Sequence, residues 1–230
     1  MTRPTPRKSP GGSEKAPDPK AHARRVAAAL ERLYPDARCA LVHADAFQLL
    51  VATVLSAQCT DVRVNLVTPA LFARYPDASA LADAEPPELE ALIRSAGFFR
   101  SKAKNLRALS GRLVEHHGGN VPPDLDALTD LPGVGRKTAN VVMGNAFDVA
   151  SGVVVDTHVK RLAFRLGLTS SRDPKVIERD LIAVVPKGRW VALSHELIDH
   201  GRKVCVARKP RCSTCALADL CPKIGVTSNA

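Results

Sequence analysis

The stretch L-P-G-V-G-R-K-T-A-N, residues 131–140, contains a tight turn that opens directly into an expected helix. Gly133 and Gly135 are separated by one residue, which lets the backbone turn sharply and directs successive N–H groups outward. Together with the start of the following helix, such a turn can bind a DNA phosphate without reading the bases. A G-x-G pattern can also be an ordinary turn between helices, but the flanking Pro132 and Arg136 favour the anion site.

On both sides of this turn, apolar residues recur every three or four positions, which is typical of amphipathic helices. The apolar face at 47–55 is one example, with Asp45 placed to cap the helix and Gln48 three residues later. The β-branched run at 153–155 is the one strand-like segment, and it is too short to make a sheet. The sequence therefore predicts an all-α protein. Helices are expected at about 26–33, 47–55, 86–97, 101–117, 125–129, 136–146, 157–166, 174–184 and 190–200, with Gly167 and Gly201 ending two of them.

The composition is that of a soluble globular protein, since 45% of the 230 residues are hydrophobic and 24% are charged. No apolar stretch reaches the roughly 20 residues of a membrane span, and no secretory signal is visible. Six cysteines without such a signal indicate a reducing compartment, so we expect a cytoplasmic protein, associated with the nucleoid in a bacterium.

The charge balance favours a polyanionic partner. The 33 Lys and Arg against 23 Asp and Glu give a net charge of +10, which favours nucleic acid over a membrane surface. Charge alone could also serve solubility. Aromatic residues are only 4% of the chain, which argues against a stacking platform for single strands.

The N-terminal segment differs from the rest of the chain. Residues 1–20 contain five prolines, five basic and two acidic residues, and almost nothing apolar. Such a segment cannot bury a core, so it is expected to form a disordered basic tail. A loose attraction to phosphate is one use for this tail, and the absence of any function is the alternative.

Four of the six cysteines lie close together near the C-terminus, in the pattern C-x6-C-x2-C-x5-C. Four thiolates at this spacing can converge on one metal centre. Structural zinc is usually held by two short C-x2-4-C pairs, and only one such pair is present, so the spacing favours a [4Fe-4S] cluster over zinc. The candidate ligands are Cys205, Cys212, Cys215 and Cys221. Cys39 and Cys59 are expected on helical stretches as buried small residues.

Three cations, Arg208, Lys209 and Arg211, lie between the first two candidate ligands. A solvated surface loop is the ordinary explanation of such a run. A loop anchored at both ends by metal ligands would instead hold the cations in a compact arrangement suited to phosphate. We therefore expect a DNA-binding loop whose cluster has a structural role.

Lys137 is the second residue of the helix that follows the Gly-rich turn. A cation is somewhat unfavourable at a helix start, so this position indicates an amine nucleophile that attacks a sugar carbon and forms an imine. The helix start helps the amine lose its proton, and exclusion of water by bound DNA must complete the effect. Asp156 is by default an N-cap of the next helix, and it can also stabilise a cationic sugar and deprotonate the amine.

Together, the motifs at 131–140, V-D-T-H at 155–158 and the cysteine pattern at 205–221 resemble the endonuclease III family of helix-hairpin-helix DNA glycosylases with an iron–sulfur cluster. The resemblance runs from about residue 25 to residue 222. It implies two helical domains flanking a DNA-binding cleft, with a helix-hairpin-helix motif in one and the cluster loop in the other. The implied domains are a helical barrel at 40–151 and a cluster domain that combines 21–39 with 152–230.

By this resemblance, Lys137 is the nucleophile and Asp156 the assisting carboxylate. The substrates would be damaged pyrimidines flipped out of duplex DNA, and abasic sites, with base release at C1′ followed by β-elimination. Gln58 and Phe98 match elements that fill the space left by the flipped base, although many bacterial members have Leu at the latter position. Without the resemblance, Gln58 would be a polar residue at a helix end and Phe98 a core residue. A monomer is expected.

Two other interpretations stay open. An adenine-excising or thymine-mismatch glycosylase could share the fold and the cluster. Adenine enzymes typically have Ser in place of Lys137 and carry an extra C-terminal domain, which is not expected here. The other interpretation, from another class, is a non-catalytic DNA-binding protein that uses the cluster for signalling. The presence of both Lys137 and Asp156 argues against it.

Overall fold

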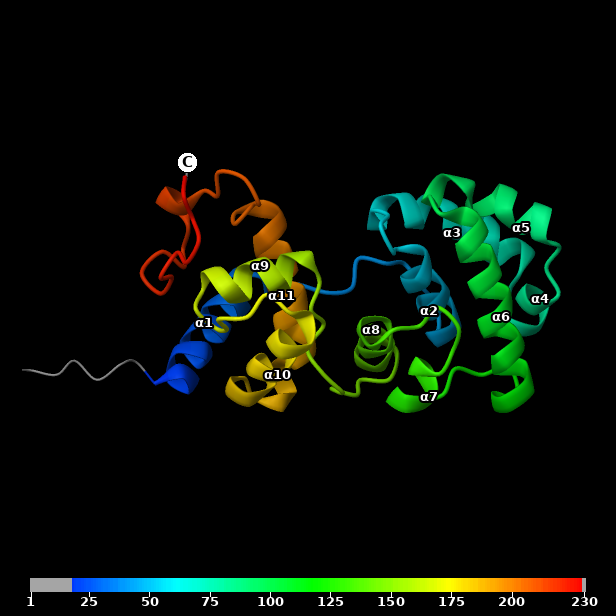
Figure 1. The fold of residues 1–230 in the computed structure, drawn as a ribbon, viewed down its shortest axis with the longest axis horizontal. Helices are drawn as coiled ribbons and strands as arrows, with labels where there is room; N and C mark the ends of the chain where they lie inside the picture. The colour runs from blue at the N-terminus through cyan, green and yellow to red at the C-terminus, as the bar shows by residue number, and fades with distance from the viewer. Residues whose placement is uncertain (1–17, 229–230) are drawn as a thin grey trace, which may run out of the picture.

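The computed structural model describes residues 18–228, and all regular secondary structure in this range is helical (Figure 1). The prediction of an all-α protein is therefore confirmed. Most of the expected N-terminal tail, residues 1–17, lies outside the described residues. None of the helices within 18–228 is long and apolar enough to cross a membrane.

The helices begin and end where the sequence can satisfy their terminal backbone groups. Asp45 caps the second helix by accepting a hydrogen bond from the Gln48 N–H at 2.8 Å. Gly118, with φ of +58°, ends the sixth helix in the left-handed conformation. The α-helices are α1 (Pro19–Leu33), α2 (Ala46–Leu55), α3 (Asp61–Arg74), α4 (Ala78–Ala82), α5 (Pro86–Ile93), α6 (Phe99–His117), α7 (Leu125–Thr129), α8 (Arg136–Ala146), α9 (Thr157–Arg165), α10 (Pro174–Val184) and α11 (Trp190–Lys203), with 3-10 turns η1 (Arg94–Ala96), η2 (Lys187–Arg189) and η3 (Cys212–Thr214).

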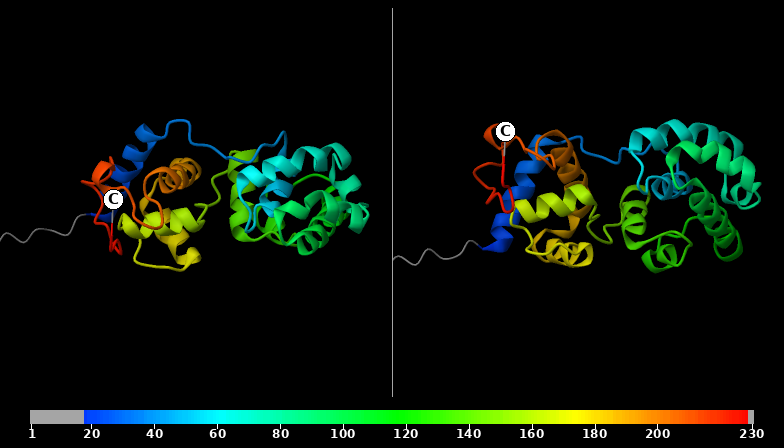
Figure 2. Two further views of the ribbon diagram at one scale, coloured as in Figure 1. Left: turned by 90° about the horizontal axis from the view of Figure 1, so that it is seen from above. Right: turned by 45° about the horizontal axis from the view of Figure 1, so that its top comes forward.

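Two separate hydrophobic cores organise these helices. The first includes Leu50 and Leu106 and is formed by α2 to α8, which make up the right-hand group in Figure 1. The second includes Leu30 and Leu197 and is formed by α1 together with α9 to α11, on the left. The first helix therefore packs with the last ones. Figure 2 shows the two groups from other sides, with the chain passing between them before α2 and after α8.

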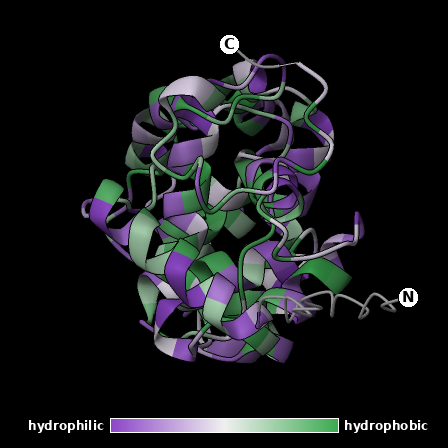
Figure 3. Cartoon of the chain, turned by 90° about the vertical axis from the view of Figure 1, so that its left-hand side faces the viewer, coloured by the Kyte–Doolittle hydropathy of each residue, from purple (hydrophilic) through white to green (hydrophobic). Residues whose placement is uncertain are grey.

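Single helices divide apolar and polar residues between their faces, and Figure 3 shows hydrophobic and hydrophilic segments alternating along the same ribbons. On α6, the expected inward residues Leu106, Leu109 and Leu113 are fully buried. Lys102, one turn before Leu106, lies on the same buried stripe. This lysine is an exception to the amphipathic pattern.

The expected bounds of α7, α8 and α10 are confirmed, whereas α1 begins earlier than expected. Its first residue, Pro19, belongs to the segment expected to be a disordered tail. Asp18 caps the helix by accepting a hydrogen bond from the Lys20 N–H at 3.0 Å, and proline is well suited to a first helical turn.

The pattern did not predict α3 or α4. Pro69 lies inside α3, and the apolar residues Val62 and Leu66 on this helix are about two-thirds or more exposed. An interior proline and outward-facing apolar side chains both obscure the helical period. α4 has only five residues, which is too few for a period to be recognised.

Gly201 does not end α11, as the sequence suggested, because the helix continues to Lys203. A Cβ at Gly201 would come within 2.9 Å of the His158 ring on α9. The Gly201 carbonyl also accepts a hydrogen bond from Arg161 Nη2 at 2.9 Å. The glycine therefore allows α9 and α11 to pack closely.

Cys39 and Cys59 lie outside helices, contrary to the prediction, and are half-buried against the first core. The Cys59 N–H donates to the Ser56 carbonyl at 3.0 Å, which closes a turn directly after α2. Both cysteines lie in the segments that flank α2, where apolar residues pack without helical structure.

Candidate active site

The Gly-rich turn between α7 and α8 is closed by its own backbone. The Val134 N–H donates to the Leu131 carbonyl at 3.0 Å, and both side chains are buried. Gly133 has φ of +78°, and a Cβ there would come within 2.7 Å of the Asn105 amide. Gly135 is the N-cap of α8 and has no side chain to accept from the first N–H groups. These donors are therefore available to an external acceptor such as a phosphate.

A cleft of about 980 Å³ is lined by residues from both groups of helices. Lys137 in the first turn of α8, Asp156 at the start of α9 and Gln58 after α2 all line it. Lys137 and Gln58 are exposed, and Asp156 is half-buried. The structure thus brings the expected nucleophile, the expected carboxylate and one expected gap-filling residue to one space.

Asp156 is held in place as the N-cap of α9. The N–H groups of His158 and Val159 both donate to its Oδ1 at 2.8 Å. His158 also lines the cleft, and burial lowers its pKa, so that its neutral ring can accept from Arg161 Nη2 at 3.1 Å. The N-cap role expected for Asp156 is confirmed, and it fixes the carboxylate at the wall of the cleft.

A buried carboxylate connects α8 to the second group of helices. Glu178 on α10 accepts hydrogen bonds from Arg136 Nε at 2.8 Å and from Asn140 Nδ2 at 2.9 Å. Asn140 in turn accepts a hydrogen bond from Ser151 Oγ at 2.8 Å. The ion pair with Glu178 raises the pKa of Arg136, whose side chain remains 48% exposed. Arg136 is thus held by Glu178, and the network fixes the helix that carries Lys137.

Gln58 and Phe98 both have left-handed backbones, with φ of +52° and +48°. Residues with side chains adopt this conformation rarely, and strained positions of this kind cluster at functional sites. Phe98 is 64% exposed, so the alternative that it is a core residue is wrong. Its side chain lies outside the lining of the cleft, as do the Gly-rich turn and the C-terminal cations.

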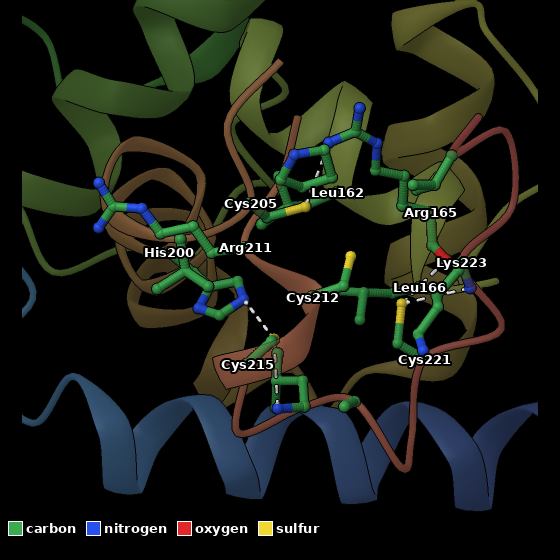
Figure 4. Close-up of a pocket in the computed structure, with 15 residues that line it drawn as sticks. Leu162, Arg165, Leu166, His200, Cys205, Arg211, Cys212, Cys215, Cys221 and Lys223 are labelled. Carbon is green, nitrogen blue, oxygen red and sulfur yellow. Dashed lines mark hydrogen bonds between the residues drawn. The ribbon is translucent and has the colours of Figure 1, made fainter. Parts of the chain in front are cut away.

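The four cysteines of the C-terminal loop surround one small cavity, and their side chains point toward a common space (Figure 4). All four are half-buried: Cys205, Cys212, Cys215 and Cys221. The N–H groups of Leu217 and Lys223 point at the sulfurs of Cys215 and Cys221, each at 3.4 Å. Backbone donors directed at sulfur are typical of thiolates that ligate a metal cluster.

Side chains supply further donors to the same sulfurs. Arg165 Nη1 lies 3.4 Å from the sulfur of Cys205. Burial lowers the pKa of His200 to about 4, so its ring is neutral at pH 7. The Tyr34 hydroxyl can donate to Nδ1 of this ring at 2.8 Å, which leaves Nε2–H for the sulfur of Cys215 at 3.5 Å. The cavity and its donors fit an iron–sulfur cluster.

The three C-terminal cations are held outward by an arginine from α9. Arg165 donates to the carbonyls of Val206 and Ala207 at 2.8 and 2.9 Å, directly before the cations. Lys209 has a left-handed backbone with φ of +51°. The exposed cations are Arg208, Lys209 and Arg211. A compact exposed group of this kind is suited to a phosphate backbone.

The sequence pattern did not identify Glu178, Lys102 and Arg165 as site or anchoring residues. Glu178 follows the buried Ile177, and Lys102 lies on the buried stripe of α6, so a charge on an apolar face was a usable signal for both. Arg165 carried no such signal, because its partners are backbone carbonyls about forty residues away in the chain.

The structure combines an all-α fold, a Gly-rich hairpin and a lysine in the adjoining cleft. Residues 51–187 match the family model of the HhH-GPD superfamily of base excision DNA repair proteins, which spans more than half of the chain. Residues 205–221 match the iron-sulfur binding domain of endonuclease III. The chain belongs to the endonuclease III family.

Individual relatives agree with this assignment. The chain is 56% identical to endonuclease III of Synechocystis sp. over 88% of its own length and 93% of the relative. A solved non-covalent endonuclease III–DNA complex is similar, with a TM-score of 0.85 and 43% identity over 89% of this chain and 95% of that one. A trapped covalent intermediate of endonuclease III with DNA also gives 0.85 and 43%, over 89% and 96%. The predicted family, fold and cluster are therefore confirmed.

Proposed function

We propose that the protein is a bifunctional DNA glycosylase and AP lyase of base excision repair that excises oxidised pyrimidines from duplex DNA. The observation that carries this proposal is the shared cleft, in which the Lys137 amine and the Asp156 carboxylate line the same space. The similar structures include endonuclease III bound to DNA and covalently trapped on it. A covalent intermediate requires a nucleophile on the protein, and Lys137 is the amine that this cleft offers on its helix-hairpin-helix side.

The reaction begins when the neutral Nζ of Lys137 attacks C1′ of the flipped nucleotide. A bond from C1′ to the lysine nitrogen replaces the glycosidic bond, and the base leaves with its bonding electrons. The proton of the attacking amine passes by way of Asp156 to the departing base. Opening of the sugar ring breaks the C1′–O4′ bond, O4′ takes up a proton from solvent, and a positively charged, protonated imine forms between Lys137 and C1′.

Strand cleavage follows from the imine. Its positive charge withdraws electrons from C2′, so a proton leaves C2′, a C1′-conjugated double bond forms, and the C3′–O bond breaks with the 3′ phosphate as leaving group. Water then hydrolyses the imine and releases Lys137. Because Asp156 uses Oδ1 for both capping bonds, Oδ2 can face the sugar and stabilise its cationic forms.

The other assigned residues bind DNA or shape the loop that does. Backbone N–H groups of the Gly-rich turn bind one phosphate, and the C-terminal cations bind another part of the backbone. When bound, the [4Fe-4S] cluster acts as a structural crosslink between its four cysteines. The DNA-contacting residues are Gln58, Phe98, Gly133, Gly135, Arg136, Arg208, Lys209 and Arg211, and the cluster ligands are Cys205, Cys212, Cys215 and Cys221.

The two hydrophobic cores support a division into a helical barrel domain at 40–151 and a cluster domain. The cluster domain combines 21–39 with 152–230, and its first helix begins at Pro19. One chain supplies both reactive side chains, which supports a monomeric active form. In a bacterial cell, binding to duplex DNA would place the protein on the nucleoid.

The lyase assignment is tested by reducing the reaction mixture with borohydride, which fixes an imine as a stable amine. Wild type is expected to give a covalent protein–DNA adduct on a duplex with one oxidised pyrimidine, and Lys137→Gln is expected to give none. Lys160→Gln is the matched control, because Lys160 lines the same cleft. If wild type excises the base without any adduct, the chain is a monofunctional glycosylase.

The carboxylate assignment is tested with Asp156→Asn. Asparagine is as good an N-cap as aspartate, so the variant keeps the helix start and removes only the negative charge. Single-turnover base release is expected to slow by about 10²- to 10⁴-fold, with DNA affinity nearly unchanged. A large loss of affinity or of folding would make Asp156 a structural cap alone.

A further inference from the structure

A buried lysine on α6 has no role in the reaction described above. Lys102 is only 5% exposed and lies on the stripe that buries Leu106 and Leu109 in the first core. Removing an ammonium group from water is costly unless hydrogen bonds compensate. A buried lysine on an apolar face therefore needs specific partners.

Lys102 finds its partners at the ends of two helical segments. Its Nζ donates to the carbonyl of Leu55, the last residue of α2, and to that of Ala96, the last residue of η1, each at 2.8 Å. Carbonyls at helix ends have no partner within the helix and carry partial negative charge. One cation thus satisfies two such ends and joins them.

The two segments joined in this way lead directly to the gap-filling residues. Gln58 lies three residues after Leu55, and Phe98 lies two residues after Ala96. Both have left-handed backbones, with φ of +52° and +48°, which persist only where the surroundings fix them. The backbone N–H of Lys102 also donates to the Phe98 carbonyl at 3.0 Å.

Gly97 lies between Ala96 and Phe98 and makes the position of Phe98 dependent on the hydrogen bond from Lys102. Gly97 has φ of +72° and ψ of 158°, a region that is open almost only to glycine. A flexible residue directly before Phe98 gives the loop conformational freedom that DNA binding would have to restrict. The bond from Lys102 to Ala96 restricts it on the protein before DNA arrives.

We propose that Lys102 is a positioning residue that fixes Gln58 and Phe98 relative to each other, so that both enter the space left by the flipped nucleotide as one rigid unit. This inference rests on the proposed function, since it uses the gap-filling role of the two residues. It adds that discrimination between damaged and intact duplex depends on a cation that does not itself touch DNA.

The test compares Lys102→Met, which keeps the length and apolar stem without the charge, with Lys104→Met on the exposed side of the same helix. The probe is a duplex with one tetrahydrofuran abasic analogue and 2-aminopurine as the opposite base. Lys102→Met is expected to bind this duplex about tenfold more weakly than wild type, with affinity for intact duplex unchanged. The rise in 2-aminopurine fluorescence on binding should also diminish, and Lys104→Met should behave as wild type.

A double-variant comparison separates positioning from a general loss of structure. If Lys102 acts through Phe98, Lys102→Met adds nothing further in a Phe98→Ala, Gln58→Ala background, whereas a structural defect adds its full effect. If Lys102→Met leaves the ratio of the affinities for abasic and intact duplex unchanged, the proposal is overturned. If Lys102→Met does not fold, Lys102→Gln, which removes the charge but keeps an amide NH2 group as donor, is measured in the same way.

A single-stranded substrate measures the lyase activity without the positioning role of Lys102. Borohydride trapping of Lys102→Met on a single-stranded abasic oligonucleotide involves no opposite base and no gap. Trapping there should equal that of wild type. If wild type itself traps on no substrate, the lyase function fails; if wild type traps and Lys102→Met retains full abasic discrimination, only the positioning role fails.

Discussion

The Gly-rich turn at 131–135 and the cysteine loop at 205–221 are both short segments proposed to bind phosphate, the turn through backbone N–H groups and the loop through cationic side chains, but they are held in different ways. The turn is closed by its own backbone, with Leu131 and Val134 buried beneath it. In the cysteine loop, Leu217 is the one apolar side chain within 205–221 that belongs to the buried core. The turn can therefore fold from the chain alone, whereas the loop depends on its cluster.

Loss of one cluster ligand should have the largest effect on stability, and this effect should be confined to the group of helices that carries the cysteine loop. Cys212→Ala is expected to lose iron and to destabilise the second core by more than about 4 kcal/mol, as loss of a structural metal site does. Hydrogen exchange should accelerate in α9 and α11 but not in α8. Cys39→Ala, outside the loop, should retain iron. Equal acceleration in α8 would show that the turn also depends on the cluster.

The support of the Gly-rich turn is tested at Glu178, which anchors α8, the helix that follows the turn. Glu178→Ala leaves the buried Asn140 amide without its acceptor and breaks the ion pair with Arg136. Because Arg136 is half-exposed, we expect a loss of about 2 kcal/mol in the free energy of unfolding, measured in urea, with iron content unchanged. Arg136→Gln should cost less. A change below about 0.5 kcal/mol for Glu178→Ala would show that the turn needs no anchor.

The smallest structural effect, and a clear effect on binding, is expected for the exposed cations of the cysteine loop. Replacing Arg208, Lys209 and Arg211 by Gln should reduce the slope of log affinity against log salt by about 2.7, with iron content and unfolding unchanged. The charge-matched control replaces the exposed Arg24, Arg25 and Arg32 of α1 by Gln. A slope equal to that of wild type would show that the loop makes no phosphate contact.

The sequence predicts those helix bounds that neighbouring residues determine. The bounds of α8 and α10 follow from nearby signals, a Gly-rich turn before one and Asp173-Pro174 before the other, and these were predicted correctly. The end of α11 could not be predicted, because Gly201 serves packing against α9 and not termination. A glycine has two uses, and only its neighbours in space distinguish them.

The site shows the same division between local and distant information. The motifs identify Lys137 and Asp156. The structure shows that both line the same cleft, and their separation in the sequence could not predict that proximity. Lys102 and Glu178 were missed because their meaning depends on distant partners: two carbonyls on other segments for Lys102, and α8 side chains for Glu178. A charged residue on a buried stripe is the sequence signal that such partners exist.

In the proposed reaction, the amine that becomes bonded to deoxyribose is Nζ of Lys137. The most direct measurement is mass spectrometry of proteolysed adducts after borohydride reduction of wild-type protein on a damaged duplex. We expect the sugar remnant on the peptide that contains Lys137, with the added mass on its Nζ. A remnant on Lys160, on another lysine or on the N-terminal amine would contradict it.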